Sequence, residues 1–81
     1  MSKHAVKIQA EWDPEASVWV AQSDDVPGLA TEAATMEELI VKLRQLVPEL
    51  LEANGIPLQT ENHELPFDVF ASRHDSARIA C

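Results

Sequence analysis

Residues 23–39 constrain the fold more than any other part of this sequence. They combine the exit of a strand, a Pro27-Gly28 turn, a short strand and the start of a helix. A glycine after proline supplies the positive φ that a type II turn requires. Thr35 and Glu38 have capping-box spacing, in which each side chain accepts a backbone N–H at the helix start. These local signals predict a strand, turn, strand and helix in one short segment.

Two further strands are predicted before this segment. Residues 5–12 alternate apolar and polar side chains, and residues 17–22 are rich in β-branched and aromatic residues. The Asp-Pro-Glu-Ala sequence at residues 13–16 has proline at the second position of a type I turn. The two runs therefore predict an antiparallel hairpin. Either Trp12 or Trp19 can face the core, and the sequence alone does not settle which.

One long helix is predicted over residues 36–53, followed by a left-handed stop at Asn54-Gly55. Its apolar side chains recur at steps of three and four residues and form one stripe. The stripe consists of Met36, Leu39, Ile40, Leu43, Val47, Leu50 and Leu51. Pro48 removes the hydrogen bond to the carbonyl four residues earlier. This conflict predicts a kink near residues 46–48 or a break into two short helices.

A final strand is predicted over residues 66–72, where polar and apolar side chains alternate again. Its inward residues are predicted to be Phe67, Val69 and Ala71. Residues 74–81 have no period and are expected to form a flexible tail, so the single domain is predicted to span residues 1–73. The order β-β-β-α-β predicts an α+β fold, a small antiparallel sheet with one helix on one face.

The composition excludes several routes to stability. The 81 residues form one small domain, which buries only about 60% of its unfolded surface. Cys81 is the single cysteine, and His4, His63 and His74 lack metal-ligand spacing, so neither a disulfide nor a metal is predicted. Self-association is the remaining route to stability, so a homo-oligomer is expected. Without a signal-peptide core or an 18-residue apolar run, the chain is predicted to be cytoplasmic and free of membrane.

The charge is strongly acidic and unevenly distributed. Fourteen Asp and Glu residues oppose six Lys and Arg residues, for a net charge of -8. Residues 8–41 contain eight carboxylates and no Lys or Arg. Such a surface repels phosphate backbones, so direct nucleic-acid binding is not predicted, whereas a basic protein is attracted. The alternative is that acidic side chains only keep a small protein soluble.

Three segments together resemble a known family. Residues 11–20, 23–28 and 31–39 are similar to the HicB-type antitoxin domain, which has a hairpin, an Asp-x-Pro-Gly turn and a capped Glu-Glu helix start. The chain is most similar to the HicB-like subgroup DUF1902, whose members share the Leu-Val-Pro-Glu-Leu-Leu run at residues 46–51. The resemblance covers about residues 5–73. It implies a partial RNase H-like fold, self-association and masking of a small basic RNA-cleaving toxin of the HicA type.

The resemblance has one departure. Many HicB antitoxins continue into a C-terminal helix-turn-helix or ribbon-helix-helix module that binds their operator. This sequence ends at Cys81 and leaves no length for such a module. Operator binding is therefore not expected of this chain.

No catalytic site is predicted. A two-metal nuclease needs converging carboxylates, and the first predicted strand offers only Glu11. Asp13, Asp24 and Asp25 lie at predicted turns, where Asp side chains accept backbone hydrogen bonds. Glu37 and Glu38 lie at the helix start, where capping and the helix dipole explain them. The sequence has no nucleophile elbow, phosphate loop or dinucleotide fingerprint. Trp12 and Trp19 fit a core better than a ligand platform, although an oligomer interface also suits them.

The predicted function is therefore non-enzymatic and needs no cofactor. The chain is expected to act as a HicB-like antitoxin-type domain that binds and occludes a small basic toxin. The residues predicted to contact this partner are Asp24, Asp25 and Glu32, with Glu15 in a weaker role. The alternative is a degenerate RNase H-like oligomeric scaffold, or a module that binds a small ligand without a toxin partner.

Overall fold

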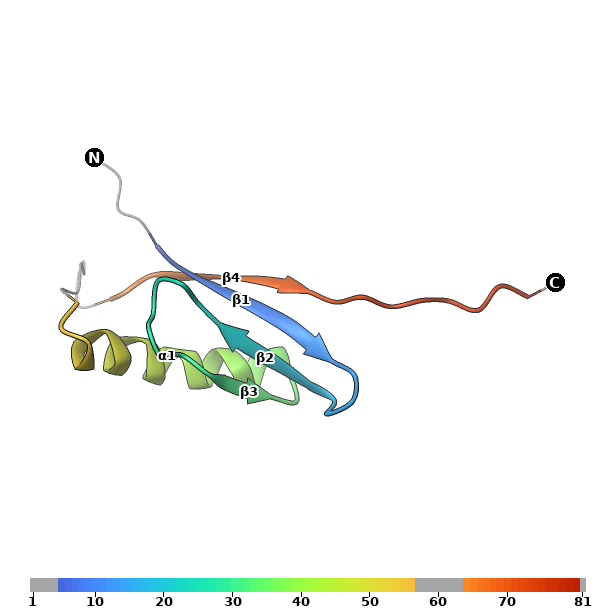
Figure 1. Ribbon diagram of the computed structural model, residues 1–81, viewed down its shortest axis with the longest axis horizontal. Helices are drawn as coiled ribbons and strands as arrows, with labels where there is room; N and C mark the ends of the chain where they lie inside the picture. Colours follow the sequence, from blue (N-terminus) through green and yellow to red (C-terminus); the bar gives the residue numbers. More distant parts are fainter. Residues whose placement is uncertain (1–4, 57–63, 81) are drawn as a thin grey trace.

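Four strands and one helix form the domain in the predicted order (Figure 1). The computed structural model describes residues 5–56 and 64–80. The elements are β1 (Val6–Asp13), β2 (Val18–Gln22), β3 (Thr31–Ala33), α1 (Met36–Ala53) and β4 (Phe67–Ser72). The small α+β fold is thus confirmed, while the predictions for His4, His63 and Cys81 concern residues outside the described ranges.

The sheet is mixed, with strand order β3-β2-β1-β4. β1 pairs with β2 and β2 with β3 in antiparallel fashion, but β4 runs parallel to β1 (Figure 1). The prediction of an antiparallel sheet was therefore wrong for its last strand. The connection between β3 and β4 runs through α1, and a crossover helix of this kind lets a later strand enter in the direction of β1.

The strand register divides the side chains between an inner face, toward α1, and an outer face. Ala10 lies opposite Ala21 and Trp12 opposite Trp19, all on the inner face. In the parallel pair, Ile8 lies opposite Val69. The predicted inward residues of the last strand therefore do lie on the inner face, because side chains at directly opposed positions share a face.

Both ends of α1 have the predicted caps. The Glu38 N–H donates to Thr35 Oγ1 at 3.1 Å, as the capping spacing predicts. At the other end, Gly55 has a φ of 69°, and the Ile56 N–H donates to the Leu51 carbonyl at 2.9 Å. This six-to-one hydrogen bond is that of a Schellman motif, so the helix stops where glycine permits the left-handed conformation.

Pro48 lies inside one continuous helix, so the predicted break into two short helices was wrong. The two apolar neighbours Val47 and Leu51 are buried on either side of it. Their packing holds the segments before and after proline against the same core. One lost backbone hydrogen bond is therefore not enough to separate them.

The turn between β2 and β3 is the predicted type II turn. Gly28 has a φ of 83°, and the Leu29 N–H donates to the Val26 carbonyl at 3.1 Å. The Asn54 side chain, at the end of α1, donates its Nδ2 to the Pro27 carbonyl at 3.2 Å and to a carbonyl of its own last helical turn. One amide therefore fastens the helix end to this turn.

The hairpin between β1 and β2 is wider than predicted. The Ser17 N–H donates to the Asp13 carbonyl at 2.7 Å, one residue beyond the span of a type I turn. Asp13 Oδ1 accepts the Glu15 N–H at 3.0 Å, and Ser17 has a φ of 57°. The aspartate side chain replaces the backbone bond that would close the shorter turn, which is a known use of Asp in loops.

The core lies between α1 and the inner face. Its ten buried residues are Ile8, Ala10, Ala21, Val26, Leu29, Ala33, Leu39, Leu43, Val47 and Leu51. Trp19 packs against this core, and Trp12 lies beside Trp19, with ring centroids 5.4 Å apart in an edge-to-face arrangement. Both tryptophans thus lie on the inner face, half-buried, where the sequence had left the choice open.

Replacing Leu43 with alanine should lower the free energy of unfolding by about 2–5 kcal/mol, because Leu43 is fully buried at the centre of α1. Urea unfolding followed by circular dichroism measures this change. Val41→Ala is the matched control, since Val41 lies on the same helix and is 61% exposed. It should change stability by only about 0.5 kcal/mol. Equal losses for both variants would contradict this packing.

Candidate protein-binding surface

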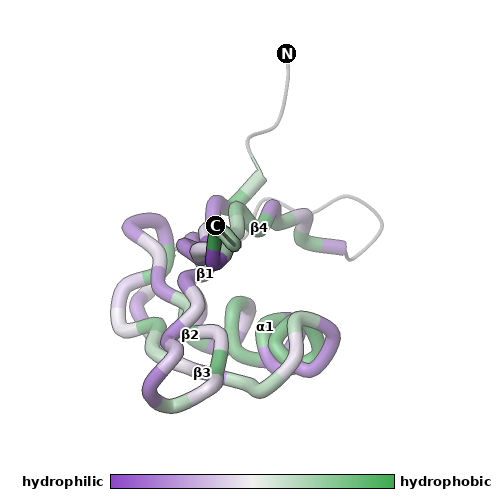
Figure 2. The backbone as a smooth tube through the Cα atoms, turned by 90° about the vertical axis from the view of Figure 1, so that its right-hand side faces the viewer, coloured by the Kyte–Doolittle hydropathy of each residue, from purple (hydrophilic) through white to green (hydrophobic). Residues whose placement is uncertain are grey.

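The outer face of the sheet is not covered by the helix, which packs only on the inner face (Figure 2). The outer side chains come from all four strands. They are Lys7, Gln9, Glu11, Val20, Gln22, Glu32, Asp68 and Phe70. All are exposed except Val20, which is half-buried. These eight residues are called the outer face.

Acidic and apolar groups alternate across the outer face. Glu11 lies opposite Val20, and Val20 lies opposite Glu32, so one valine is flanked by two glutamates. Because adjacent strands are about 4.8 Å apart, the two glutamate positions are about 10 Å apart. In the adjoining row, Phe70 lies opposite Gln9 and is 53% exposed. The face thus offers apolar contact area within a negative field.

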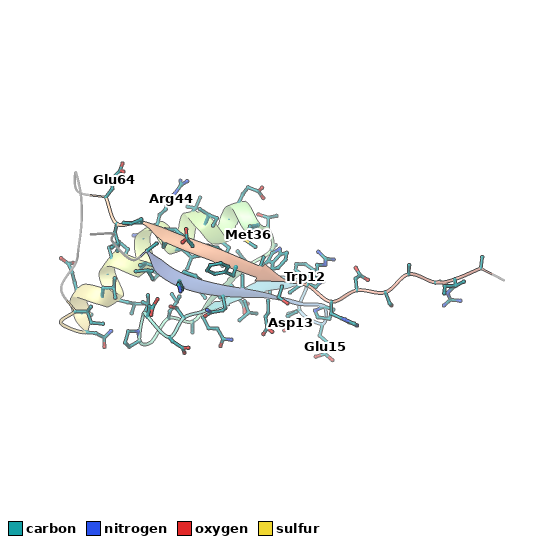
Figure 3. The ribbon with its side chains drawn as sticks, turned by 90° about the horizontal axis from the view of Figure 1, so that it is seen from above. Trp12, Asp13, Glu15, Met36, Arg44 and Glu64 are labelled. Atoms are coloured by element: carbon teal, nitrogen blue, oxygen red, sulfur yellow. The ribbon has the colours of Figure 1, made fainter. Side chains whose placement is uncertain are left out.

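Two of the predicted partner-binding residues belong to this region. Glu32 lies in β3 on the outer face, and Asp24 borders a hollow of about 440 Å³ that Gln9 and Gln22 also line. Glu15 lies apart from them, in the hairpin turn at the other end of β2 (Figure 3). The structure therefore places Glu32 opposite Val20, Asp24 beside a separate hollow after the end of β2, and Glu15 in the hairpin turn.

Asp25, the fourth predicted residue, has a structural partner. Its Oδ2 accepts the backbone N–H of Lys7 at 3.0 Å. The Ser23 hydroxyl donates to the Lys7 carbonyl at 2.5 Å and accepts the Asp25 N–H at 3.0 Å. These three hydrogen bonds fasten the loop after β2 to the beginning of β1. The carboxylate of Asp25 is thereby partly used within the fold.

Sequence reasoning missed Glu11 and Phe70 as members of this surface. Glu11 was considered only as a possible metal ligand, and Phe70 was given no role. The alternation of residues in β1 and β4 did contain the signal, since it places both residues on the polar side. Their proximity to Glu32 and Gln9 required the register of four strands.

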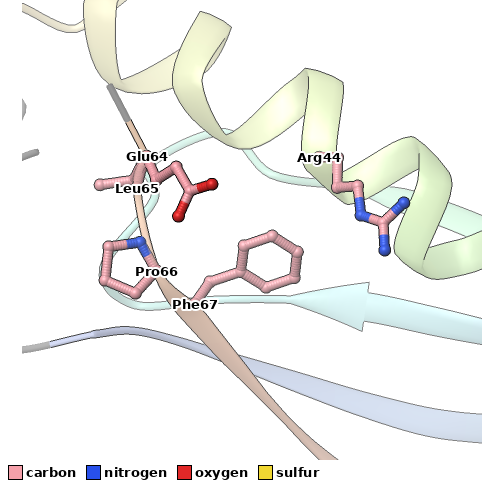
Figure 4. Close-up of a pocket in the computed structure, with 5 residues that line it drawn as sticks. All are labelled: Arg44, Glu64, Leu65, Pro66 and Phe67. Atoms are coloured by element: carbon pink, nitrogen blue, oxygen red, sulfur yellow. The ribbon is translucent and has the colours of Figure 1, made fainter. Parts of the chain in front are cut away.

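A second hollow of about 470 Å³ opens on the inner side, between α1 and the beginning of β4. Its lining residues are Arg44, Glu64, Leu65, Pro66 and Phe67. Figure 4 shows the Phe67 ring directed from the strand toward the helix, with Arg44 projecting from α1 above the same space. The hollow exists because α1 packs against β2 and β3 and diverges from β4.

Two kinds of site are absent from the described ranges. Within residues 5–56 and 64–80, no three His, Cys, Asp or Glu side chains are grouped closely enough to hold a metal ion. In the same part of the chain, α1 is not apolar enough over its length to cross a bilayer.

The fold and this surface define a small α+β domain with one covered and one acidic, uncovered sheet face. A family model for the domain of unknown function DUF1902 matches residues 5–80, so the chain belongs to the DUF1902 family. A search of curated proteins found no match.

A solved structure is also similar. The crystal structure of the hypothetical protein TTHA1013 from the extremely thermophilic bacterium Thermus thermophilus shares 53% sequence identity with this chain. The match covers 94% of this chain and 100% of that protein, with a TM-score of 0.68. The likeness supports the fold and carries no function.

Asp24 and Asp25 should respond differently to substitution. Asp25→Ala removes the acceptor of the Lys7 N–H and should destabilise the domain by about 1 kcal/mol. Asp24→Ala is the matched control, because Asp24 is exposed, and it should leave the urea midpoint nearly unchanged. Equal midpoints for the two variants would show that the Asp25 hydrogen bond contributes nothing measurable.

Proposed function

We propose that this domain is a non-enzymatic, HicB-like protein-binding module that occludes a small basic RNA-cleaving toxin. One observation carries the proposal: the outer face joins the exposed Phe70 and the half-buried Val20 to carboxylates on a face that no other described element covers. Glu11 and Glu32 flank Val20, and Phe70 extends the apolar area. The sequence resemblance to HicB antitoxins supplies the class of partner.

The electrostatic part of the mechanism follows from the charge distribution. The chain has a net charge of -8, and the one basic residue of the outer face is Lys7. A basic partner is therefore steered toward this side of the sheet, and its association rate rises as ionic strength falls. An RNA-cleaving enzyme uses its positive surface to bind phosphates. A carboxylate-bearing face that covers this surface competes directly with RNA.

The apolar part of the mechanism holds the complex together after encounter. Interfaces rely on aromatic anchors that are desolvated at their centre. Phe70 is the aromatic side chain of the outer face and is about half exposed. Its burial by the partner adds to the hydrophobic contact of Val20 and slows dissociation, whereas the rim of glutamates governs the approach.

The partner itself is tested by affinity purification of the tagged chain from its native cell at low salt, followed by mass spectrometry. The expected result is a small basic protein that cleaves RNA alone and loses this activity when the chain is added. Recovery of the chain with only copies of itself would contradict the proposal and favour the oligomeric scaffold.

Reversal of charge on the outer face should slow association with that basic protein. The double variant Glu11→Lys and Glu32→Lys should lower the association rate on the order of tenfold and flatten its salt dependence. The matched control reverses Glu49 and Glu52, two exposed residues of α1, and so makes the same change in net charge. Stopped-flow measurement of the association rate at several salt concentrations compares the outer-face variant with this control. Equal losses would mean that net charge, and not the outer face, governs binding.

A further inference from the structure

The two edges of the sheet are not equivalent. β3 is three residues long, and Lys42 Nζ donates to the carbonyl of Glu32 at 2.6 Å. A short strand capped by a lysine is one of the ways in which proteins protect an edge from pairing. β4 is six residues long and, within residues 5–56 and 64–80, pairs with β1 on one side only. Its other side presents backbone N–H and C=O groups to solvent.

β4 continues into an extended arm, residues 73–80, which runs beyond the end of β1 (Figure 1). Every residue of the arm is exposed, and Ile79 is 84% exposed. The Arg73 guanidinium lies 4.3 Å from the centroid of the Trp12 ring. This cation–π contact anchors the beginning of the arm in line with β4 and on the inner face. The arm is thus an extended segment that no strand of the described part of the chain pairs with.

The arm and the rest of the domain have opposite charges. The arm contains two arginines and one aspartate, a net charge of +1. Residues 5–72 contain three Lys or Arg residues and thirteen Asp or Glu residues, a net charge of -10. A second copy of this chain therefore offers the arm an acidic surface that lies next to an unpaired strand edge.

We propose that two copies of this chain form a symmetric dimer in which each arm pairs antiparallel with β4 of the other copy. The register that places Arg78 opposite Asp68 joins opposite charges on the outer face. In an antiparallel pair, one residue forward on one strand lies opposite one residue back on the other. The same register therefore places Ile79 opposite Phe67. The ion pair and the apolar pair each occur twice, as a twofold axis requires.

The inner hollow receives Ile79 in this arrangement. Side chains alternate along an extended strand, so Ile79 lies on the same face as Arg73, which contacts Trp12 on the inner face. Phe67 lines the hollow of about 470 Å³ between α1 and β4 (Figure 4). An isoleucine from the second copy fills this space with apolar contact. The dimer uses the edge of β4 and engages Asp68 of the outer face. It leaves Glu11, Val20 and Glu32 open, so it does not depend on the proposed toxin binding.

Sedimentation velocity of the full chain tests the dimer. Arg78→Glu should raise the dimer dissociation constant about tenfold, because each dimer contains two Asp68–Arg78 pairs. Adding Asp68→Arg to this variant should restore dimerisation, since the charges are only exchanged. Ile79→Asp should yield monomers, whereas the control Val41→Asp, at an exposed apolar position of α1, should not.

A cysteine pair tests the register. In a Cys81→Ser background, Asp68→Cys together with Arg78→Cys should give a covalent dimer on oxidation, because directly opposed strand residues meet the distance that a disulfide requires. Both positions are exposed, so the fold tolerates the change. A monomeric wild type at high micromolar concentration, failure of the charge exchange to restore the dimer, or a cysteine pair that stays monomeric would each overturn the proposal.

Discussion

Large helix side chains packed on small sheet side chains hold this domain together. The register aligns one row of small residues across the inner face, namely Ala71, Ala10, Ala21 and Thr31. Leu39, Leu43 and Val47 of α1 are fully buried within the same core. Ala10 and Ala21 of this row are fully buried. Their small size lets the helix approach the sheet, and interiors tolerate little added volume. This close approach also brings the helix end within hydrogen-bonding distance of the turn before β3.

The parts of the fold that sequence could predict are those specified within a few residues. Thr35 and Gly55 define the ends of α1, and Gly28 defines a turn, because each acts through its own backbone conformation. The parallel pairing of β4 could not be predicted in this way, since it depends on how residues far apart in the chain align. The predicted break at Pro48 was wrong for the same reason, because burial of its neighbours outweighs a local penalty.

The acidic residues also divide into a property that sequence predicts and a property that depends on tertiary contacts. Asp24 and Asp25 are adjacent in the sequence and identical in chemistry, yet only Asp25 has a carboxylate bonded to β1. Glu11 and Glu32 are far apart in the sequence, but the register places them on either side of Val20. Charge and composition therefore predicted an acidic surface. Which carboxylates face solvent together, and which maintain a loop, depends on tertiary contacts.

The position of β4 has a consequence for how the domain assembles. β1, β2, β3 and α1 are consecutive in the chain and share one core, whereas Phe67 reaches Val6 only after all of them. Closing this long loop costs more chain entropy than forming the hairpin. β4 is also held by β1 alone, because α1 packs against β2 and β3. β4 therefore enters the sheet through one neighbouring strand, with six paired positions, and β1 remains an open edge until it arrives.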